Sequence, residues 1–458
     1  MNKFEQKIFV LDCEMNDSGI PIDVKAAKRL LELSDYFTRI AYREAVCLTG
    51  GISLTQVAKL LEWVNANSCL GLENLQAGTV ENTLRRFTLS ESPKVRRVLE
   101  LRKQVAKASV KKLNRILACI SPDDTVKGCL RYCGTTTGRW SATSIQPQNF
   151  IKPLYGNVGA VFNDLMACSI QEISVLYENP LDAVASCMRS LIKAPEGYEF
   201  VVADYSQIEQ RVLAWIADDT NLLDQYGKGF DPYVEMAKSI FPDIEIKHYE
   251  RELSKQVVLG AGFGMWTNRF VETCGKYGIE ADENLAAKAL KTFRNKHSKI
   301  VAYWDSLENL YKKAISNPGR ILAFGHLRTL CTGFGLFVFL PSGRYICYPY
   351  AKLRNGKISY YRQIGQTVLW DWKETWHGQL IENLAQAIAR DVLAQGMVNA
   401  NENGYKPVFT VHDELISMVP KGSGDVEELE NSICGMPSWA DGLPLKAEGY
   451  RSERYKKG

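Results

Sequence analysis

An acidic side chain stands at the end of an apolar run at two places in this 458-residue chain. The first run leads directly into Asp204, and the second leads into His412, Asp413 and Glu414. Short apolar runs of this kind are typical of buried strands, so we expect these carboxylates at the edge of a sheet. Carboxylates gathered in this way can share divalent metal ions, which catalyse phosphoryl transfer.

A pair of basic residues lies between the two acidic positions. Arg251 and Lys255 are four residues apart in a segment of helical character, so both side chains point to the same side of the helix. Such a pair can hold the oxygens of a phosphate group. The alternative is a surface pair with Glu250 or Glu252, but together with the carboxylates the pattern favours a site for phosphoryl transfer.

The composition is that of an ordinary globular protein. Hydrophobic residues make up 46% and charged residues 24% of the chain, and a net charge of +4 does not by itself indicate a nucleic-acid partner. No apolar run approaches the roughly 20 residues of a membrane span, and the first residues lack a signal-peptide core. We therefore predict a cytoplasmic protein without a membrane partner. The twelve cysteines are scattered, which favours buried free thiols over a metal site or disulfides.

The elements that must position these residues are helical stretches with strands between them. Helical periodicity predominates over residues 52–119 and 217–318, and it predicts a further helix from about 378 to 399. Strands are expected around turns within 336–362, and residues 445–449 are expected to close the sheet that carries the acids. This order indicates the α+β class with inserted subdomains.

Residues 94–119 are predicted to form one long helix with a basic face. Two interpretations of that face remain open: a solvated surface, or a surface that follows a phosphate backbone. Its basic residues are Lys94, Arg96, Arg97, Arg102, Lys103, Lys107, Lys111, Lys112 and Arg115.

Four sequence blocks, in order over roughly residues 130–420, resemble the DNA polymerases of family A. The helical segment 382–391 is similar to the bacteriophage members in particular. The blocks are residues 137–139 with 148–149 (primer-template region), 204–209 (motif A), 251–264 (motif B) and 412–414 (motif C).

The resemblance implies a right-hand fold, in which an antiparallel palm sheet carries the acids, helical fingers hold the nucleotide and a helical thumb grips duplex DNA. It also implies an order of segments along the chain. The expected segments are a lead-in over 1–34, the thumb over 35–130, the first part of the palm over 131–215, the fingers over 216–325 and the second part of the palm over 326–458.

The resemblance implies two Mg²⁺ ions, for which Mn²⁺ can substitute. Asp204 and Asp413 would each bridge both ions, the backbone carbonyl of Tyr205 would add an oxygen ligand, and Glu414 would be a supporting acid. One ion would lower the pKa of the primer 3′-hydroxyl, and the other would hold the triphosphate and the leaving pyrophosphate. Lys255 would complete the catalytic set.

Nucleotide-binding roles also follow from the resemblance. Arg251 would bind the γ-phosphate. Lys255 would bind on the α-phosphate side and donate a proton to the pyrophosphate as it leaves. Gln207 would lie near the triphosphate, while Tyr233 stands where many members have a phosphate-binding His. Glu209 occupies the position that crowds the sugar 2′-carbon and so rejects ribonucleotides. The alternative for Glu209 is an acid on a helix surface.

Two nucleotide-binding positions depart from the family pattern. Leu259 replaces the Phe or Tyr that lies against the nucleotide sugar, so tolerance of 3′-deoxy nucleotides does not carry over. Phe263 replaces a Tyr that checks the base pair; it keeps the ring for stacking but lacks the hydroxyl. Core packing on a helix face is the alternative for both.

The expected partners are primer-template DNA and dNTPs. Arg139 and Gln386 would donate to minor-groove acceptors that all base pairs share, which checks geometry without reading sequence. His412 would reach the phosphate at the primer end. The full predicted set for DNA is Arg139, Gln148, Asn149, Gln386, His412, Lys103, Lys107, Lys111 and Lys112.

A proofreading exonuclease is not expected. Asp12 and Glu14 imitate the first acidic motif of such domains, but no aspartate occurs between Asp35 and Asp123 to complete a two-metal cluster. A separate exonuclease, helicase or processivity factor is therefore a possible partner. Residues 149–189 and 296–380 exceed the corresponding segments of compact bacterial members, and longer loops are favoured over partner-docking insertions.

Two rival functions remain at this point. The first is an RNA polymerase or a sugar-tolerant polymerase, against which Glu209 argues. The second is a protein that binds primer-template DNA but has lost catalysis, against which the complete set of Asp204, Asp413, Arg251 and Lys255 argues.

Overall fold

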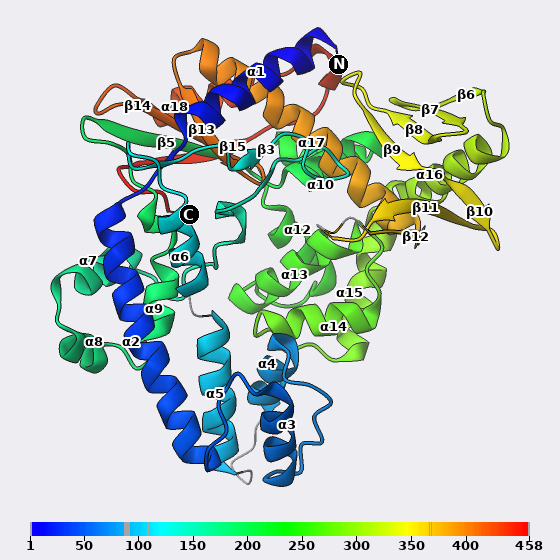
Figure 1. Ribbon diagram of the computed structural model, residues 1–458. Helices are drawn as coiled ribbons and strands as arrows, with labels where there is room; N and C mark the ends of the chain where they lie inside the picture. Colours follow the sequence, from blue (N-terminus) through cyan, green and yellow to red (C-terminus); the bar gives the residue numbers. More distant parts are fainter. Residues whose placement is uncertain (1, 87–91, 108–109, 366, 368, 457–458) are drawn as a thin grey trace.

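The structure is a computed structural model that describes residues 2–86, 92–107, 110–365, 367 and 369–456 (Figure 1). The side chains of Arg86, Lys107 and Val110 lie outside the described part.

A four-stranded antiparallel sheet with strand order β13-β14-β5-β15 forms the centre of the fold. The strands are β5 (Tyr198–Tyr205), β13 (Lys406–Val411), β14 (Glu414–Pro420) and β15 (Ala447–Ser452). Residues 200–203 of β5 are buried without alternation, because the sheet is covered on both faces. The predicted C-terminal strand is thus confirmed as β15, which pairs with β5.

Helices cover this sheet (Figure 1). They are α1 (Lys3–Ser18), α10 (Ile208–Ile216), α17 (His377–Glu402) and α18 (Val426–Ile433). α18 contacts β5 and β15, whereas α17 and α1 contact β13. The helix predicted over 378–399 is confirmed as α17, whose 26 residues have buried side chains along most of their length.

A helical lobe with its own core extends away from the sheet (Figure 1). Its helices are α2 (Val24–Thr49), α3 (Val57–Ala66), α4 (Ala77–Arg86), α5 (Pro93–Lys107) and α6 (Val110–Ala118). α2 begins at Val24, because the Asp23 side chain caps it by accepting from the Ala26 amide at 2.9 Å. The helix predicted over 94–119 corresponds to α5 and α6, and residues 108–109, which the prediction includes, lie outside the described residues.

Residues 149–189, expected as a longer loop, form α7 (Val158–Ala167), α8 (Ile170–Leu176) and α9 (Pro180–Ser186). α7 and α9 pack on α2. That expectation is wrong because apolar positions such as Val161, Leu165 and Leu181 are buried in the main core. Short elements join these parts: β1 (Ile20–Pro21), β2 (Thr125–Val126), β3 (Leu130–Arg131), β4 (Ser141–Ala142), and the 3-10 helices Pro147–Asn149, Arg189–Leu191 and Ser438–Ala440.

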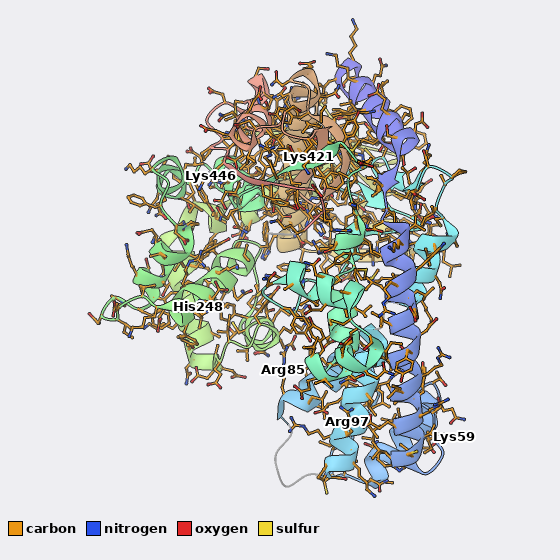
Figure 2. All side chains as sticks on the ribbon, turned by 90° about the vertical axis from the view of Figure 1, so that its left-hand side faces the viewer. Lys59, Arg85, Arg97, His248, Lys421 and Lys446 are labelled. Carbon is orange, nitrogen blue, oxygen red and sulfur yellow. The ribbon has the colours of Figure 1, made fainter. Side chains whose placement is uncertain are left out.

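A second helical group follows α10, as the sequence predicts for 217–318. It consists of α11 (Thr220–Gly227), α12 (Pro232–Ile240), α13 (His248–Ala261), α14 (Thr267–Lys276), α15 (Glu283–Lys296) and α16 (Ser298–Ser316). The tip of the first lobe touches this group, since Arg85 of α4 donates to the Lys276 carbonyl at 2.8 Å (Figure 2).

Two small antiparallel sheets occupy the segment between α16 and α17, which was expected to contain a longer loop. The first consists of β6 (Ile321–Phe324), β7 (Leu327–Thr332), β8 (Gly335–Phe339) and β9 (Tyr345–Pro349); the second consists of β10 (Lys352–Arg354), β11 (Lys357–Gln363) and β12 (Trp370–Thr375). The predicted turn at Asn355 and Gly356 is confirmed, with φ of 49° and 74° in a two-residue hairpin.

The twelve cysteines are free, but only Cys129, Cys187, Cys274 and Cys331 are buried, so the prediction of buried thiols holds for part of the set. In the described part of the chain, no helix has the length and apolar character that crossing a membrane requires.

Candidate active site

The two acid-bearing strand ends lie side by side. Asp204, near the end of β5, is the register partner of Glu414 at the start of β14. Asp413 lies in the tight turn before β14, where His412 adopts a left-handed φ of 60°. The Tyr205 amide donates to the Asp413 carbonyl at 3.3 Å, which ties this turn to the end of β5. The sheet thus brings together the acids that the sequence placed some 200 residues apart.

Arg139 bridges two of the acids. One nitrogen of its guanidinium, Nη2, lies 2.8 Å from Asp413 Oδ1 and 2.7 Å from Glu209 Oε1. Burial raises the pKa of Glu209, and although the Arg139 charge opposes this, the charge of Asp413 adds to it. Only 27% of the Glu209 side chain is exposed. Glu209 is therefore a site residue held by an ion pair, not an acid on an open helix surface.

Glu414 and Glu448 flank Asp204 in the sheet. Glu414 is 1% exposed and accepts a hydrogen bond from the Tyr455 hydroxyl at 2.6 Å. Glu448, on β15, is the other register partner of Asp204, and its exposed carboxylate pairs with Lys446 at 3.0 Å. Sequence reasoning missed the place of Glu448, because nothing in its local sequence sets its register against β5.

Arg251 and Lys255 project from the same side of α13, where both contact acids. Arg251 Nη2 lies 2.8 Å from Asp231 and its Nη1 3.0 Å from Glu252. Lys255 lies 3.6 Å from Glu252. The surface pairing considered as an alternative is thus partly present, with Glu252, although both cations remain more than one-third exposed and accessible to a ligand.

Contacts connect Arg251 to the turn that follows Asp204. The Arg251 guanidinium lies 5.4 Å from the centre of the Tyr233 ring. Burial raises the pKa of Tyr233 to about 12, with a further increase from the Asp231 charge, while Arg251 and a hydrogen bond with Gln207 oppose it. Gln207 stands at the start of α10 with a φ of 49°. This chain of contacts links Arg251, through Tyr233, to Gln207 in the turn that follows Asp204.

The two departures from the family pattern differ in burial. Leu259 is 41% exposed on α13, so core packing does not explain it. Phe263 is partly buried against the main core. Leu259 follows Lys255 by four residues, so it continues the side of α13 that carries the basic pair, whereas Phe263 lies in the turn just after the helix.

All five residues predicted to meet DNA near the acids line one cavity of about 300 Å³. Gln148 Nε2 also donates to the Thr410 carbonyl of β13 at 3.0 Å, which holds the cavity against the sheet. These residues are Arg139, Gln148, Asn149, Gln386 and His412.

The predicted lysines divide into two groups. Lys111 and Lys112 line a neighbouring cavity of about 290 Å³, where burial lowers the pKa of Lys112 and its ammonium donates to the Asn149 carbonyl at 3.0 Å. Lys103 forms an ion pair with Glu81 at 3.3 Å, and Arg97 pairs with Glu44 at 2.6 Å (Arg97 is labelled in Figure 2). Much of the basic face of α5 is thus used for contacts between helices. Lys107 was also predicted here, but its side chain lies outside the described residues.

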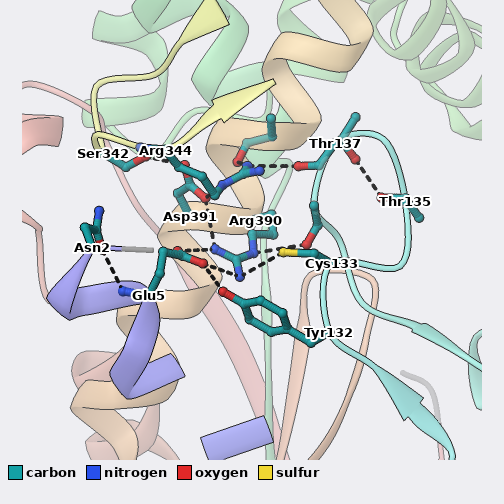
Figure 3. A network of polar contacts seen from close by, with 12 residues as sticks. Asn2, Glu5, Tyr132, Cys133, Thr135, Thr137, Ser342, Arg344, Arg390 and Asp391 are labelled. Atoms are coloured by element: carbon teal, nitrogen blue, oxygen red, sulfur yellow. Dashed lines mark hydrogen bonds and ion pairs between the residues drawn. The ribbon is translucent and has the colours of Figure 1, made fainter. Parts of the chain in front are cut away.

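A buried network holds the loop that carries Arg139 (Figure 3). Arg390 of α17 is fully buried; it pairs with Glu5 of α1 at 2.6 Å and donates to the Gly138 carbonyl at 3.1 Å. Arg344 pairs with Asp391 at 2.7 Å and donates to the Thr137 carbonyl at 2.9 Å. Sequence reasoning missed these residues, since an Arg on an apolar helix gives no sign of its distant partner.

Asp12, which imitates a nuclease motif, has a structural role. It lies on α1, 5% exposed, and accepts from the Trp140 indole at 2.9 Å and from the Asn16 amide at 3.2 Å. Burial raises its pKa above the ordinary value.

The oxygen atoms at the strand ends suit a hard cation. Carboxylates of Asp204 and Asp413 and the nearby backbone carbonyls are the donor types that Mg²⁺ prefers. Within the described ranges, no group of three or more His, Cys, Asp or Glu is arranged to hold a metal ion. A metal would therefore rest on the Asp204–Asp413 pair rather than on a closed cage of side chains, as is usual for Mg²⁺ bound together with a phosphate substrate.

The chain matches known polymerases in sequence and in fold. Residues 26–319 match the sequence pattern of DNA polymerase family A. The chain is 31% identical to the DNA polymerase of Bacillus phage SP02, over 99% of this chain and 71% of that protein. The DNA polymerase I of Helicobacter pylori is 22% identical over 96% of this chain, which spans only 42% of that relative.

The POL domain of Pol1 from M. smegmatis, solved in complex with a DNA primer-template and a dNTP, shares the fold. The TM-score is 0.71 at 17% identity, and the match covers 99% of this chain and 70% of that one. The class is thus that of a template-copying polymerase with the right-hand α+β fold. More particularly, the chain belongs to DNA polymerase family A, whose members are DNA-directed DNA polymerases.

Proposed function

We propose that this chain extends the 3′-hydroxyl of a primer on a DNA template with dNTPs and uses two divalent ions held by Asp204 and Asp413. The observation that carries the proposal is the meeting of these acids at adjacent strand ends, with the Tyr205 amide bonded to the Asp413 carbonyl. The DNA primer-template and dNTP bound to the M. smegmatis domain support the same choice of ligands.

The protein's own residues have distinct tasks in this reaction. Arg251 and Lys255 hold the triphosphate, and they stabilise the negative charge that develops as pyrophosphate leaves. Tyr233 interacts with both Gln207 and Arg251, and so it holds α13 in place relative to the turn after Asp204. When bound by the acids, the metal ions supply activation of the 3′-hydroxyl and neutralisation of phosphate charge.

Glu209 selects deoxyribonucleotides by excluding a 2′-hydroxyl. Its ion pair with Arg139 supports this role, because a carboxylate held at 2.7 Å by a buried guanidinium cannot easily swing away from the sugar. Arg139 itself must release Asp413 when DNA and metal enter while its Nη2 keeps the pair with Glu209, and its Nη1 then meets the minor groove in the adjacent cavity.

We assign the helical lobe α2–α6 to the thumb, the central sheet to the palm and α11–α16 to the fingers. The α11–α16 group lies within the predicted fingers, whereas α2 (Val24–Thr49) crosses the boundary predicted between lead-in and thumb at residue 34. The contact between Arg85 and the Lys276 carbonyl then joins thumb and fingers. We also propose that the chain has no proofreading activity, since the indole of Trp140 occupies one Asp12 oxygen. An exonuclease, helicase or processivity factor would act as a separate partner.

The test is extension of a labelled primer on a DNA template with Mg²⁺, run separately with dNTPs and rNTPs. We expect wild type to extend with dNTPs, Asp413→Asn to lose extension, and Glu448→Gln to retain it. Glu448 is the matched control because it also neighbours Asp204 in the sheet but is exposed and paired with Lys446. Equal loss in both variants would contradict the assignment of Asp413, and extension with rNTPs by wild type would refute the role of Glu209.

A further inference from the structure

The small sheet β10–β12 carries aromatic rings on its solvent face. Tyr361 is the register partner of Trp372, so the two side chains share one face of the sheet. Tyr361 also stacks on Trp370, with ring centroids 5.8 Å apart and planes at 24°. Tyr350, just before β10, adds a ring whose centroid lies 6.3 Å from that of Tyr361.

Cations accompany these rings. Lys352 Nζ and the Arg354 guanidinium lie 3.8 Å and 4.0 Å from the centre of the Trp372 ring. Neither cation forms an ion pair with any residue of the described ranges. The acid on this face, Glu374, is already paired with Lys357 at 3.1 Å. We call the set Tyr350, Lys352, Arg354, Tyr361, Trp370 and Trp372 the aromatic face.

The opposite face of the sheet attaches it to the body of the protein. Ile358, Tyr360 and Thr375 are at most 5% exposed. Trp370 and Tyr350 are 48% and 55% exposed. Tyr361 and Trp372 are partly buried, so Trp370 and Tyr350 are the exposed rings of the aromatic face. Exposed apolar side chains that gather on one face mark a binding surface.

The aromatic face continues toward the predicted insertion site. Trp376 follows β12 in extended conformation, and a Cβ placed on Gly264 would lie only 2.9 Å from its ring. A Cβ on Gly378 would lie 2.2 Å from the Phe263 carbonyl oxygen, so only glycine permits this approach. The sheet is thus pinned beside the end of α13, where Phe263 is expected to meet the new base pair (Figure 1).

The duplex side of the site lies in the other direction along α17. Gln386, which lines the cavity predicted for the primer-template, is eight residues beyond Gly378, or about 12 Å along a helix axis. Phe263, just after α13, approaches Gly378 and so lies about two helical turns along α17 from Gln386.

We propose that the aromatic face binds the single-stranded template ahead of the insertion site, an inference that rests on the proposed function. Exposed rings on a sheet can stack on bases of any sequence, and Lys352 and Arg354 supply positive charge for the backbone. A protein partner is less suited, because Lys352 and Arg354 have no ion-pair partner within the described ranges and the one acid on this face, Glu374, is already paired with Lys357.

The test compares binding of two primer-templates by the full chain without dNTPs. One has a single unpaired template nucleotide, and the other has about twelve, a length within the range of known single-strand sites. We expect wild type to bind the long overhang at least about fivefold more tightly, because one stacked base raises affinity by about that factor or more. We expect Trp370→Ala to lose most of that preference. The control is Phe334→Ala, which removes a more exposed ring (78%) from the other small sheet.

Extension of the single-nucleotide overhang is measured in parallel. Loss of extension there in wild type would count against the proposed function alone, since overhang preference is read from binding. The inference is overturned if wild type shows no preference for the long overhang, or if a folded Trp370→Ala protein keeps that preference. The aromatic face would then bind another partner. Should Trp370→Ala not fold, the double substitution of Lys352 and Arg354 by Ala tests the same surface, with the same loss of preference expected.

Discussion

Replacement of Glu5 by Ala tests whether the N-terminal helix supports the active site. Glu5 holds Arg390 through contacts of 2.6 Å and 3.1 Å, and the Arg390 side chain is fully buried. Removing one partner of a buried ion pair typically costs about 3–5 kcal/mol. We expect about 3 kcal/mol, the lower end of that range, because Arg390 keeps Asp391 at 3.2 Å and the Gly138 carbonyl at 3.1 Å.

This free energy converts to a measurable shift in melting temperature. Over 458 residues, an unfolding entropy of about 2 cal/mol/K per residue gives a decrease in Tm of about 3 °C if the chain unfolds as one unit. The assay is calorimetry of wild type, Glu5→Ala and Glu14→Ala; Glu14 is exposed on the same helix and serves as the control. Equal Tm values for Glu5→Ala and Glu14→Ala would refute the reasoning.

The ion pair between Glu5 and Arg390 also makes the stability of the protein depend on pH. Burial raises the pKa of Glu5, but the hydrogen bond and charge of Arg390 more than offset this, so its pKa lies below the ordinary value. A carboxyl group with a lowered folded-state pKa stabilises the protein above its unfolded-state pKa, and this contribution is lost as pH falls through the folded-state value. The Tm difference between wild type and Glu5→Gln should therefore be constant near neutral pH and shrink below about pH 4. A difference that grows on acidification would contradict the ion pair.

Three further substitutions test other parts of the site. Asp12→Ala should lower the free energy of unfolding by about 1–3 kcal/mol, because it leaves a buried indole donor without its acceptor. Primer extension should be unchanged, and a loss of nuclease activity instead would show that the acid is catalytic. Glu209→Ala should raise rNTP incorporation relative to dNTP by about tenfold or more, measured as the ratio of kcat/KM values, and an unchanged ratio would exclude the steric role. Lys111→Ala should reduce the slope of log Kd for duplex DNA against log salt by about 0.9, whereas Lys103→Ala should change it less because its ammonium is already paired; equal slopes for both variants would argue against a phosphate contact at Lys111.

The parts of the fold that the sequence predicts are those with strong local patterns. The apolar runs before Asp204 and Asp413 predict strands, and the length and periodicity of 378–399 predict α17, because each pattern extends over several turns or alternations. The Asn355-Gly356 turn is predicted for the same reason, since its two positive φ angles need these residue types.

The helices and sheets of the two longer segments escaped prediction because their elements are short. α8 and α9 have seven residues each, and β10 has three, so no periodicity develops within them. Their stability comes from tertiary contacts, such as the packing of α9 on α2.

The candidate site shows a related limit. The types of its residues follow from motifs, but the pairing of Arg139 with Asp413 and Glu209 joins positions far apart in the chain, and spacing carries no information about it. In the structure Arg139, which was expected to donate to the minor groove, is a counter-ion for two of the acids.

That arrangement gives the N-terminal segment a part in the site. Gly138 precedes Arg139, and its carbonyl is held by Arg390, whose charge is balanced by Glu5. Because the neighbouring Thr137 carbonyl is held by Arg344, the loop is fixed from two sides before it presents the guanidinium to Asp413. A loop that is fixed in this way can release Asp413 by a change in the Arg139 side chain alone, which costs less than moving backbone. The buried pair at α1 therefore acts on the acids through loop position rather than through charge, and its loss should weaken primer-template binding more than it slows the chemical step.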